Sequence, residues 1–387
     1  MLHITVRRCR RTTPAILGIV AIMSMAVAAC SSSGSSSSTA SSSSSATGSS
    51  TDSAQVTAAK SFIAPYLSAP TTIGPTTPLT SKAPSGKTLV NLMCTTSPQC
   101  TTINAGEAAA AKAVGWKLQT IPFDSTNVAT LISGLKTALR YHPVAVSLSG
   151  IPQVLWQSEV PAYQAAGVPI IPQQTGPVTT SATVPVNEGD DSTIVGKIVG
   201  NWFIANSDGK GKALVVDIPD FGYLKEITTS MDSTISSGCA SCTISSFNAT
   251  IAQQAGNTIV PAVVSALQRD RSINYVLAAD GVLIPGLSSA MSAAGITGVT
   301  VGGALATAEN EQAILNGTET AFTTYNSSYV GWQTVDIVLR DIEKMTIPPY
   351  DSGVPTQLVT KATVGTPNSS ATAPANYPQQ FEKLWGV

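Results

Sequence analysis

The chain of 387 residues contains only two histidines, His3 and His142. Many hydrolases need an imidazole beside the reacting group. The sequence also has no G-x-S-x-G elbow, no H-E-x-x-H pair, no P-loop and no G-x-G-x-x-G after a strand-like run. His142 precedes Pro143 ahead of an apolar run, a place that favours a backbone contact over proton transfer. We therefore expect no enzymatic activity, no cofactor and no metal site.

Charged residues are also scarce, at 11% of the chain, with 21 Lys plus Arg against 22 Asp plus Glu. Four of the basic residues are arginines within the first 29 positions, which contain no acid, so the rest of the chain carries 17 − 22 = −5 charges. An acidic chain lacks the basic surface that nucleic acids require. We expect a folded chain with no nucleic-acid partner.

The start of the chain has the composition of an export signal. Residues 1–29 contain the four arginines near their start, and an uncharged apolar stretch that is short for a membrane span follows. Ala28 and Ala29 directly before Cys30 resemble the lipobox of bacterial lipoproteins, in which the cysteine is acylated. We predict a lipoprotein signal peptide and a lipid anchor on Cys30; the alternative is an ordinary secretory signal that happens to contain a cysteine.

Serine dominates the next stretch, residues 30–55, together with threonine and glycine. Such a composition has little apolar surface to bury, so it favours a flexible tether between membrane and folded part.

Four further cysteines form two local pairs, Cys94 with Cys100 and Cys239 with Cys242. In an oxidising compartment such pairs are expected to form disulfides. The alternative for the second pair is a thioredoxin-like redox motif. That motif would open a helix, whereas Cys239 follows the end of a helical stretch at Gly238, which favours a structural disulfide.

From Lys87 onward, short runs rich in Val, Ile and Leu alternate with helix-length amphipathic segments, the pattern of parallel strands joined by crossover helices. Two sets of four runs predict an α/β fold with two similar doubly wound parallel-sheet lobes. The runs begin at Thr88, Trp116, Val144 and Val168, and again at Ala213, Thr243, Tyr275 and Val299. Helices are expected at 127–140, 192–206, 221–237, 257–269, 284–294, 308–316 and 329–345.

The segments after Gly303 are too short for a third domain, and we expect them to cross between the lobes as a hinge. The first lobe is predicted to contain 87–187 plus 323–345, and the second lobe 188–322 plus 350–365.

Polar and aromatic residues follow the predicted strands at their carboxyl ends, where open α/β sheets bind ligands. Each residue alone favours a turn or cap, so only the shared position points to a site. In the first lobe they are Thr95, Thr96, Asp124, Ser125, Ser149, Gly150, Gln173 and Gln174. In the second they are Asp220, Phe221, Asn248, Asp280, Gly302 and Gly303, with Tyr325 and Asn326 at a crossing. Trp156 is a further aromatic candidate, with an equal case for a core position.

Three stretches, TLVNLM, FDSTNVATLISGLKTALRYHPVAVSLSG and NYVLAADGVLIPGLSSAMSAAGI, resemble the type I, ribose-binding-like periplasmic binding proteins that supply solutes to ABC transporters. The resemblance covers residues 87–364 and implies two lobes that close over one solute. It matches Asp280 to an acidic position that bonds a sugar hydroxyl, and Asp124 to a polar turn. Ala304 and Tyr325 stand where the family often has Asp and Gln, so no particular pentose or hexose is implied.

Together with the predicted lipid anchor on Cys30, the resemblance implies a monomeric extracytoplasmic protein that delivers a small sugar-like ligand to an ABC transporter permease. A ligand-sensing lipoprotein that signals to a membrane receptor kinase stays open as an alternative, and a surface hydrolase is a third, disfavoured one. In the cleft, stacking is assigned to Phe221, Trp156 and Tyr325, and hydrogen bonding to Asp124, Asp280 and Asn326.

Overall fold

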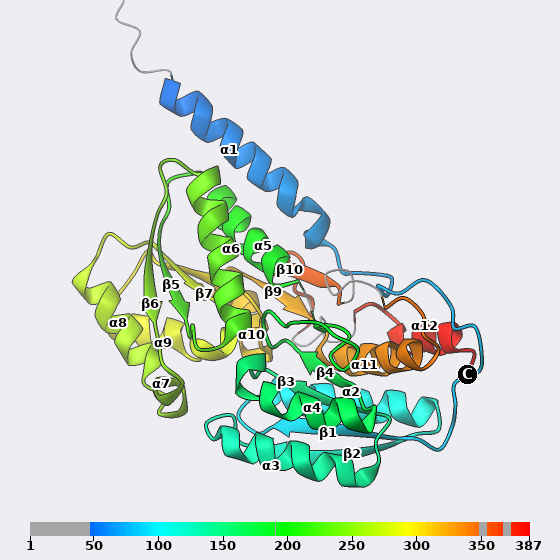
Figure 1. Cartoon of the computed structure of the whole chain (residues 1–387). Coiled ribbons are helices and arrows are strands. Elements are labelled where there is room, and N and C mark those ends of the chain that lie inside the picture. The colour runs from blue at the N-terminus through cyan, green and yellow to red at the C-terminus, as the bar shows by residue number, and fades with distance from the viewer. Residues whose placement is uncertain (1–46, 190, 348–353, 367–372) are drawn as a thin grey trace, which may run out of the picture. The chain divides into compact units, whose positions relative to one another are not determined.

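The computed structural model describes residues 47–189, 191–347, 354–366 and 373–387 (Figure 1). The predicted signal peptide, Cys30 and the tether up to residue 46 lie outside the described residues. Among the described helices, none is both long and apolar enough to cross a membrane.

The predicted tether is wrong in its last part, because residues 47–55 belong to helix α1 (Thr47–Ile63). Val56, Ala59 and Ile63 are buried on one side of this helix, which packs against helix α5 of the second sheet. The apolar residues that hold the helix therefore lie downstream of the serine-rich stretch.

The first sheet has four parallel strands in the order β2-β1-β3-β4. Alternate residues of β1 face different sides: Val90 packs with the core beneath α3, and Leu89 packs with the core beneath α2. Helices thus cover both faces, as the apolar runs predict. The strands are β1 (Thr88–Cys94), β2 (Lys117–Phe123), β3 (Ala145–Ser149) and β4 (Ile170–Gln173), with helices α2 (Pro98–Ala113), α3 (Val128–Ala138) and α4 (Val160–Ala166).

The second sheet has six strands in the order β10-β9-β8-β7-β5-β6, all parallel except β10, which runs antiparallel to β9. The prediction of two parallel-sheet lobes is confirmed. The strands are β5 (Lys212–Asp217), β6 (Thr243–Asn248), β7 (Tyr275–Ala278), β8 (Thr300–Gly303), β9 (Ala321–Tyr325) and β10 (Thr356–Thr360). The helices are α5 (Ser192–Asn206), α6 (Gly222–Gly238), α7 (Ile251–Ala255), α8 (Ile259–Arg269), α9 (Leu287–Ala293) and α10 (Ala308–Asn316).

Helix α11 (Ser327–Ile342) links the two sheets. The strands before and after it, β9 and β10, pair in the second sheet, whereas α11 itself packs along α2 of the first. The chain therefore crosses between the sheets here, where the sequence predicts a hinge. The division into lobes stays a prediction; the pairing places residues 323–325 in the second sheet, although the predicted first lobe includes them.

Two segments that were not predicted cover α11, one that follows α1 and one at the C-terminal end of the described chain. In the first, Gly74 donates its backbone N–H to the Tyr329 hydroxyl (2.9 Å), and Arg340 Nη2 donates to the Thr77 carbonyl (2.8 Å). The second, helix α12 (Tyr377–Trp385), stacks Trp385 on Trp332, with ring centroids 5.5 Å apart.

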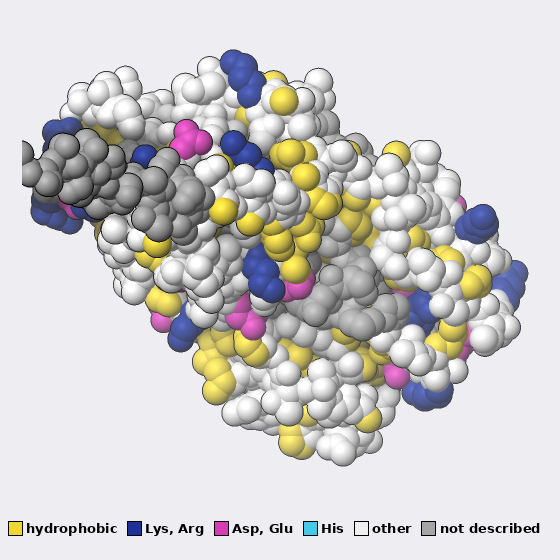
Figure 2. Space-filling view, turned by 90° about the horizontal axis from the view of Figure 1, so that it is seen from above, with side chains coloured by type: hydrophobic (Ala, Val, Ile, Leu, Met, Phe, Trp, Pro, Cys, Tyr) yellow, Lys and Arg dark blue, Asp and Glu magenta, His cyan; other side chains and the backbone are white. Residues whose placement is uncertain are grey.

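The surface carries few charges. On the face shown in Figure 2, Lys and Arg side chains are scattered among uncharged and hydrophobic ones and form no single basic patch.

We expect the change Trp385→Ala to lower the free energy of unfolding by about 3–5 kcal/mol. It removes a fully buried indole, its stacking on Trp332, and the hydrogen bond from Nε1 to Asp336 Oδ1 (2.9 Å). The matched control is Lys383→Ala on the exposed side of the same helix, for which a change below about 0.5 kcal/mol is expected. Urea unfolding measures both; equal losses would contradict this account of α12.

Candidate ligand-binding site

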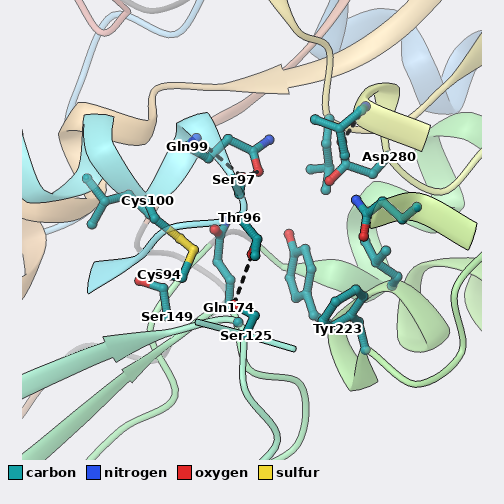
Figure 3. Close-up of a pocket in the computed structure, with 17 residues that line it drawn as sticks. Cys94, Thr96, Ser97, Gln99, Cys100, Ser125, Ser149, Gln174, Tyr223 and Asp280 are labelled. Carbon is teal, nitrogen blue, oxygen red and sulfur yellow. Dashed lines mark hydrogen bonds between the residues drawn. A yellow bond between two sulfur atoms is a disulfide. The ribbon is translucent and has the colours of Figure 1, made fainter. Parts of the chain in front are cut away.

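A pocket lies between loops at the carboxyl ends of strands from both sheets (Figure 3). The lining from the first sheet and its helices comprises Cys94, Thr96, Ser97, Gln99, Cys100, Ile103, Ser125, Ser149, Gly150 and Gln174. The lining from the second comprises Phe221, Tyr223, Leu224, Gln254, Asp280, Val282 and Leu305.

The loop between β1 and α2 builds most of the first wall. Thr96 donates its hydroxyl to Ser125 Oγ (3.0 Å), which ties this loop to the one after β2. Ser97 caps α2 by accepting the Gln99 backbone N–H (3.3 Å). The predicted disulfide between Cys94 and Cys100 is present and closes the loop. The loop thus presents hydroxyl and amide groups to the pocket.

The opposite wall comes from the start of α6 and the loop after β7. Figure 3 shows Tyr223 and Asp280 across the pocket from Thr96 and Ser97. Asp280 Oδ1 accepts the Val282 backbone N–H (3.0 Å), so the turn that follows β7 holds this carboxylate in place. This wall adds one acid and two aromatic rings, those of Phe221 and Tyr223, to the polar groups opposite.

Beneath the first wall, a buried chain of hydrogen bonds leads away from the pocket. Ser149 donates to Gln173 Oε1 (2.5 Å), and Gln173 Nε2 donates to Glu107 Oε1 (2.6 Å) and to Thr334 Oγ1 (2.7 Å). Thr334 in turn donates to Glu188 Oε2 (2.7 Å). We call these five residues the floor network. It connects a pocket-lining serine to α2, to α11 and to the crossover after β4.

The two carboxyls of the floor network are protonated more readily than exposed ones. Burial raises the pKa of Glu107 to about 7, and hydrogen bonds from Ser147 and Gln173 offset part of this rise. Burial also raises the pKa of Glu188 well above its usual value, and the nearby Glu107 charge adds to the effect. Both carboxyls are therefore mostly protonated at pH values below about 7.

Five of the residues predicted to bind ligand line the pocket: Thr96, Ser125, Gly150, Phe221 and Asp280. Each follows a strand end, as the sequence argument requires. Two more residues of the predicted strand-end set, Ser149 and Gln174, also line the pocket.

Three other predicted residues lie outside the lining and have capping or turn contacts. Thr95 donates its hydroxyl to the Phe123 carbonyl (3.1 Å), and Asp124 accepts the Thr126 backbone N–H (2.8 Å). Asn326 caps α11 by accepting the Tyr329 N–H (3.1 Å). A role in binding stays a prediction for these three residues.

Three more lie behind the pocket. Trp156 is fully buried in the first-sheet core and donates to the Ile151 carbonyl (2.9 Å), so its place matches the core interpretation. Gln173 belongs to the floor network. Tyr325 donates its hydroxyl to Gln174 Oε1 (3.0 Å) and so supports a lining residue from outside.

Asp220 and Asn248 also lie outside the lining, in the turn after β5 and at the end of β6, as do Gly302 and Gly303 at the end of β8. Gly303 sits so close to Ala278 of β7 that an added Cβ would overlap the Ala278 carbonyl. Its lack of a side chain thus serves strand packing.

The lining residues missed by the sequence argument lie mainly on the first turns of helices. Ser97 and Gln99 open α2, Tyr223 opens α6, and Gln254 belongs to the short α7, which was not predicted. The one available signal was Ser97 before Pro98, a helix-start pattern next to a strand end.

A family model described as the periplasmic binding protein domain matches residues 92–344. The chain belongs to this family. Its two sheets have the fold of the type I periplasmic binding proteins, as the resemblance implied. No curated protein matches the chain.

Solved structures with the same fold match almost three quarters of this chain. An ABC sugar transporter subunit from Rhodobacter sphaeroides 2.4.1 is 18% identical, with a TM-score of 0.64 over 72% of this chain and 99% of that chain. A solute-binding protein from Agrobacterium vitis with bound allitol is 18% identical, with a TM-score of 0.63 over 72% of this chain and 97% of that chain. A solute-binding protein from Mycobacterium smegmatis with bound glycerol is 17% identical, with a TM-score of 0.64 over 73% of this chain and 96% of that chain. At these identities the likeness shows the fold alone.

We expect Glu107→Gln to flatten part of the pH dependence of stability. The folded protein keeps the Glu107 proton between pH 4.5 and about 7, where the unfolded chain releases it, so this stabilisation is present below pH 4.5 and is lost as the pH rises through 7. The loss is on the order of 3 kcal/mol. Glutamine keeps a neutral side chain of the same shape, so the variant gains stability relative to the natural chain from pH 5 to pH 8.

Urea unfolding at pH 5 and pH 8 measures this effect, with Glu343→Gln as control. Hydrogen bonds from Ser81 and Thr80 lower the pKa of Glu343 to about 2. Its contribution is present above its ordinary pKa and is lost only as the pH falls through about 2, so this control shifts stability equally at both pH values. A Glu107→Gln protein with an unchanged pH slope would contradict a buried neutral carboxyl.

Proposed function

We propose that this protein binds a small, uncharged, polyhydroxylated solute in the pocket between its two lobes. The observation that carries the proposal is the lining: hydroxyls and amides from the first wall face a single carboxylate, Asp280, and the ring of Tyr223. None of the lining residues, all within the described chain, is basic. Such a lining offers hydrogen-bond partners for hydroxyl groups and a flat apolar face, but no counter-charge for an anion.

Relatives of the same fold support this ligand class. The Agrobacterium vitis protein binds allitol and the Mycobacterium smegmatis protein binds glycerol, and both are neutral polyols. A further Agrobacterium vitis protein is bound to α-D-tagatopyranose, a neutral sugar.

The proposal includes the context of binding. The protein acts outside the cytoplasm, held to the membrane by a lipid on Cys30, and passes its unaltered ligand as a monomer to an ABC transporter permease. Membership of the periplasmic binding protein domain family and the lipobox-like AAC before the serine-rich stretch support this context.

A panel of ligands tests the proposal by thermal shift. Allitol, glycerol, D-ribose, D-xylose and D-tagatose represent the proposed class, and gluconate and spermidine are charged comparisons. A true ligand at 100 times its dissociation constant stabilises the folded protein by about 2.7 kcal/mol. We expect a shift with at least one neutral compound; shifts confined to gluconate or spermidine would contradict the proposed class.

The change Asp280→Asn should weaken binding of the panel ligand about tenfold, because it replaces a charged hydrogen-bond acceptor with a neutral one. Asparagine still offers an oxygen to the Val282 N–H, so the turn is retained. The matched control is Asp220→Asn, an exposed acid outside the lining, which should leave the affinity unchanged. Isothermal titration calorimetry measures both; equal affinities in the two variants would remove Asp280 from the site.

A further inference from the structure

The disulfide Cys94–Cys100 is part of the pocket wall itself. Cys94 ends β1 and Cys100 lies in the first turn of α2, with Cα atoms 5.7 Å apart, and both residues line the pocket. The five residues between them supply three of the polar lining groups: Thr96, Ser97 and Gln99. Figure 3 shows the sulfur bridge beside these side chains.

Both cysteines of the bridge belong to elements that are packed on several sides. Cys94 belongs to a strand that is paired on both sides, with β2 and with β3. Helix α2 is fixed against α11, because Gly106 approaches Ser328 so closely that an added Cβ would overlap the Ser328 carbonyl. The bridge thus joins two packed elements across the short loop that lines the pocket.

The other contacts given for this loop are hydrogen bonds of Thr95, Thr96 and Ser97. Thr95 is bonded to the Phe123 carbonyl through its backbone N–H (3.0 Å) and its hydroxyl (3.1 Å). Thr96 has its hydroxyl bond to Ser125, and Ser97 caps its own helix. The side-chain bonds are exposed or partly buried, and each one is individually weak.

The second disulfide provides an internal comparison. Cys239–Cys242 follows α6, where Cys239 Sγ approaches the Gly209 carbonyl (3.2 Å) and Ala240 N–H donates to Gln55 of α1 (3.4 Å). It does not line the pocket. The two bridges therefore differ in their relation to the site, although both close short loops.

We propose that the Cys94–Cys100 disulfide is a positioning element for ligand binding, which holds Thr96, Ser97 and Gln99 in their binding arrangement before the ligand arrives. The inference rests on the proposed function for the identity of the site. Without the bridge, the ligand must order this loop on binding, and ordering three side chains weakens affinity about tenfold or more.

Two double variants test the inference, Cys94→Ser/Cys100→Ser and Cys239→Ser/Cys242→Ser. Hydrogen–deuterium exchange of the ligand-free proteins should show faster exchange of the backbone amides of Thr95, Thr96, Ser97 and Gln99 in the first variant only. Calorimetry with allitol and D-ribose should show the tenfold loss of affinity, with a less favourable binding entropy, in the first variant only. The second variant controls for stability lost with any disulfide.

Reduction separates positioning from the loss of sulfur contacts. In the Cys239→Ser/Cys242→Ser background, dithiothreitol transfers two electrons and two protons to the remaining bridge, giving two thiols and the cyclic disulfide of the reagent. All other pocket atoms are retained. Mass spectrometry after thiol alkylation verifies cleavage of the bond, and the affinity should fall as in the first variant.

Unchanged exchange at residues 95–99 in the Cys94→Ser/Cys100→Ser protein would overturn the inference, as would faster exchange with full affinity. A loss in the serine variant that the reduced protein does not share would assign the effect to sulfur contacts and also overturn it. If the natural chain binds no compound of the neutral panel, the proposed function fails, and the exchange measurement alone decides whether the bridge positions the loop.

Discussion

Direct contact between the backbones of α2 and α11 is the constraint on which the rest of the structure depends. It requires glycine on both helices: an added Cβ at Gly106 would overlap Ser328, and one at Gly331 would overlap the backbone of Glu107. Helix α11 is flanked by strands of the second sheet, so this contact ties the two sheets together. It also decides which side chains meet. Glu107 directly follows Gly106, and Thr334 lies one helical turn after Gly331. Both side chains therefore point into the interface where the floor network forms.

The floor network contains two carboxyl groups and no basic residue among its five members. The nearby Arg340 is engaged with Asp336, with Nε to Oδ2 at 2.7 Å, and that carboxylate also accepts from Trp385. Glu107 and Glu188 are therefore left to hydroxyl and amide partners in a buried setting, where a neutral acid costs far less than a charged one. A neutral network can still fix the positions of its members. Gln173 bonds both Ser149 at the pocket and Glu107 of α2, and so holds the serine relative to that helix.

The sequence predicted the repeating part of the fold and missed the parts that depend on distant partners. Apolar runs beginning at Thr88 and Ala213 mark their strands because a strand buried on both faces needs such a run whatever its neighbours are. Helix α12 has no such local signature. Phe381 and Trp385 are spaced to share a face, but their partner Trp332 lies far back in the chain, and only the folded structure brings it near.

The same distinction explains which site residues were predictable. Thr96, Ser125 and Gly150 directly follow strands, and parallel strands bring their carboxyl ends to one edge by topology alone. Ser97 and Gln99 lie at the start of α2, between two cysteines that are six positions apart and form a disulfide, so their place depends on how the chain turns after β1. The aromatic residues Trp156 and Tyr223 show what position along the chain does not determine. Trp156 follows β3 and Tyr223 follows β5 at a similar distance along the chain, yet Trp156 turns into the core and Tyr223 lines the pocket. Proximity to a strand end therefore selects backbone position, and the direction of a large side chain is set by the packing around it.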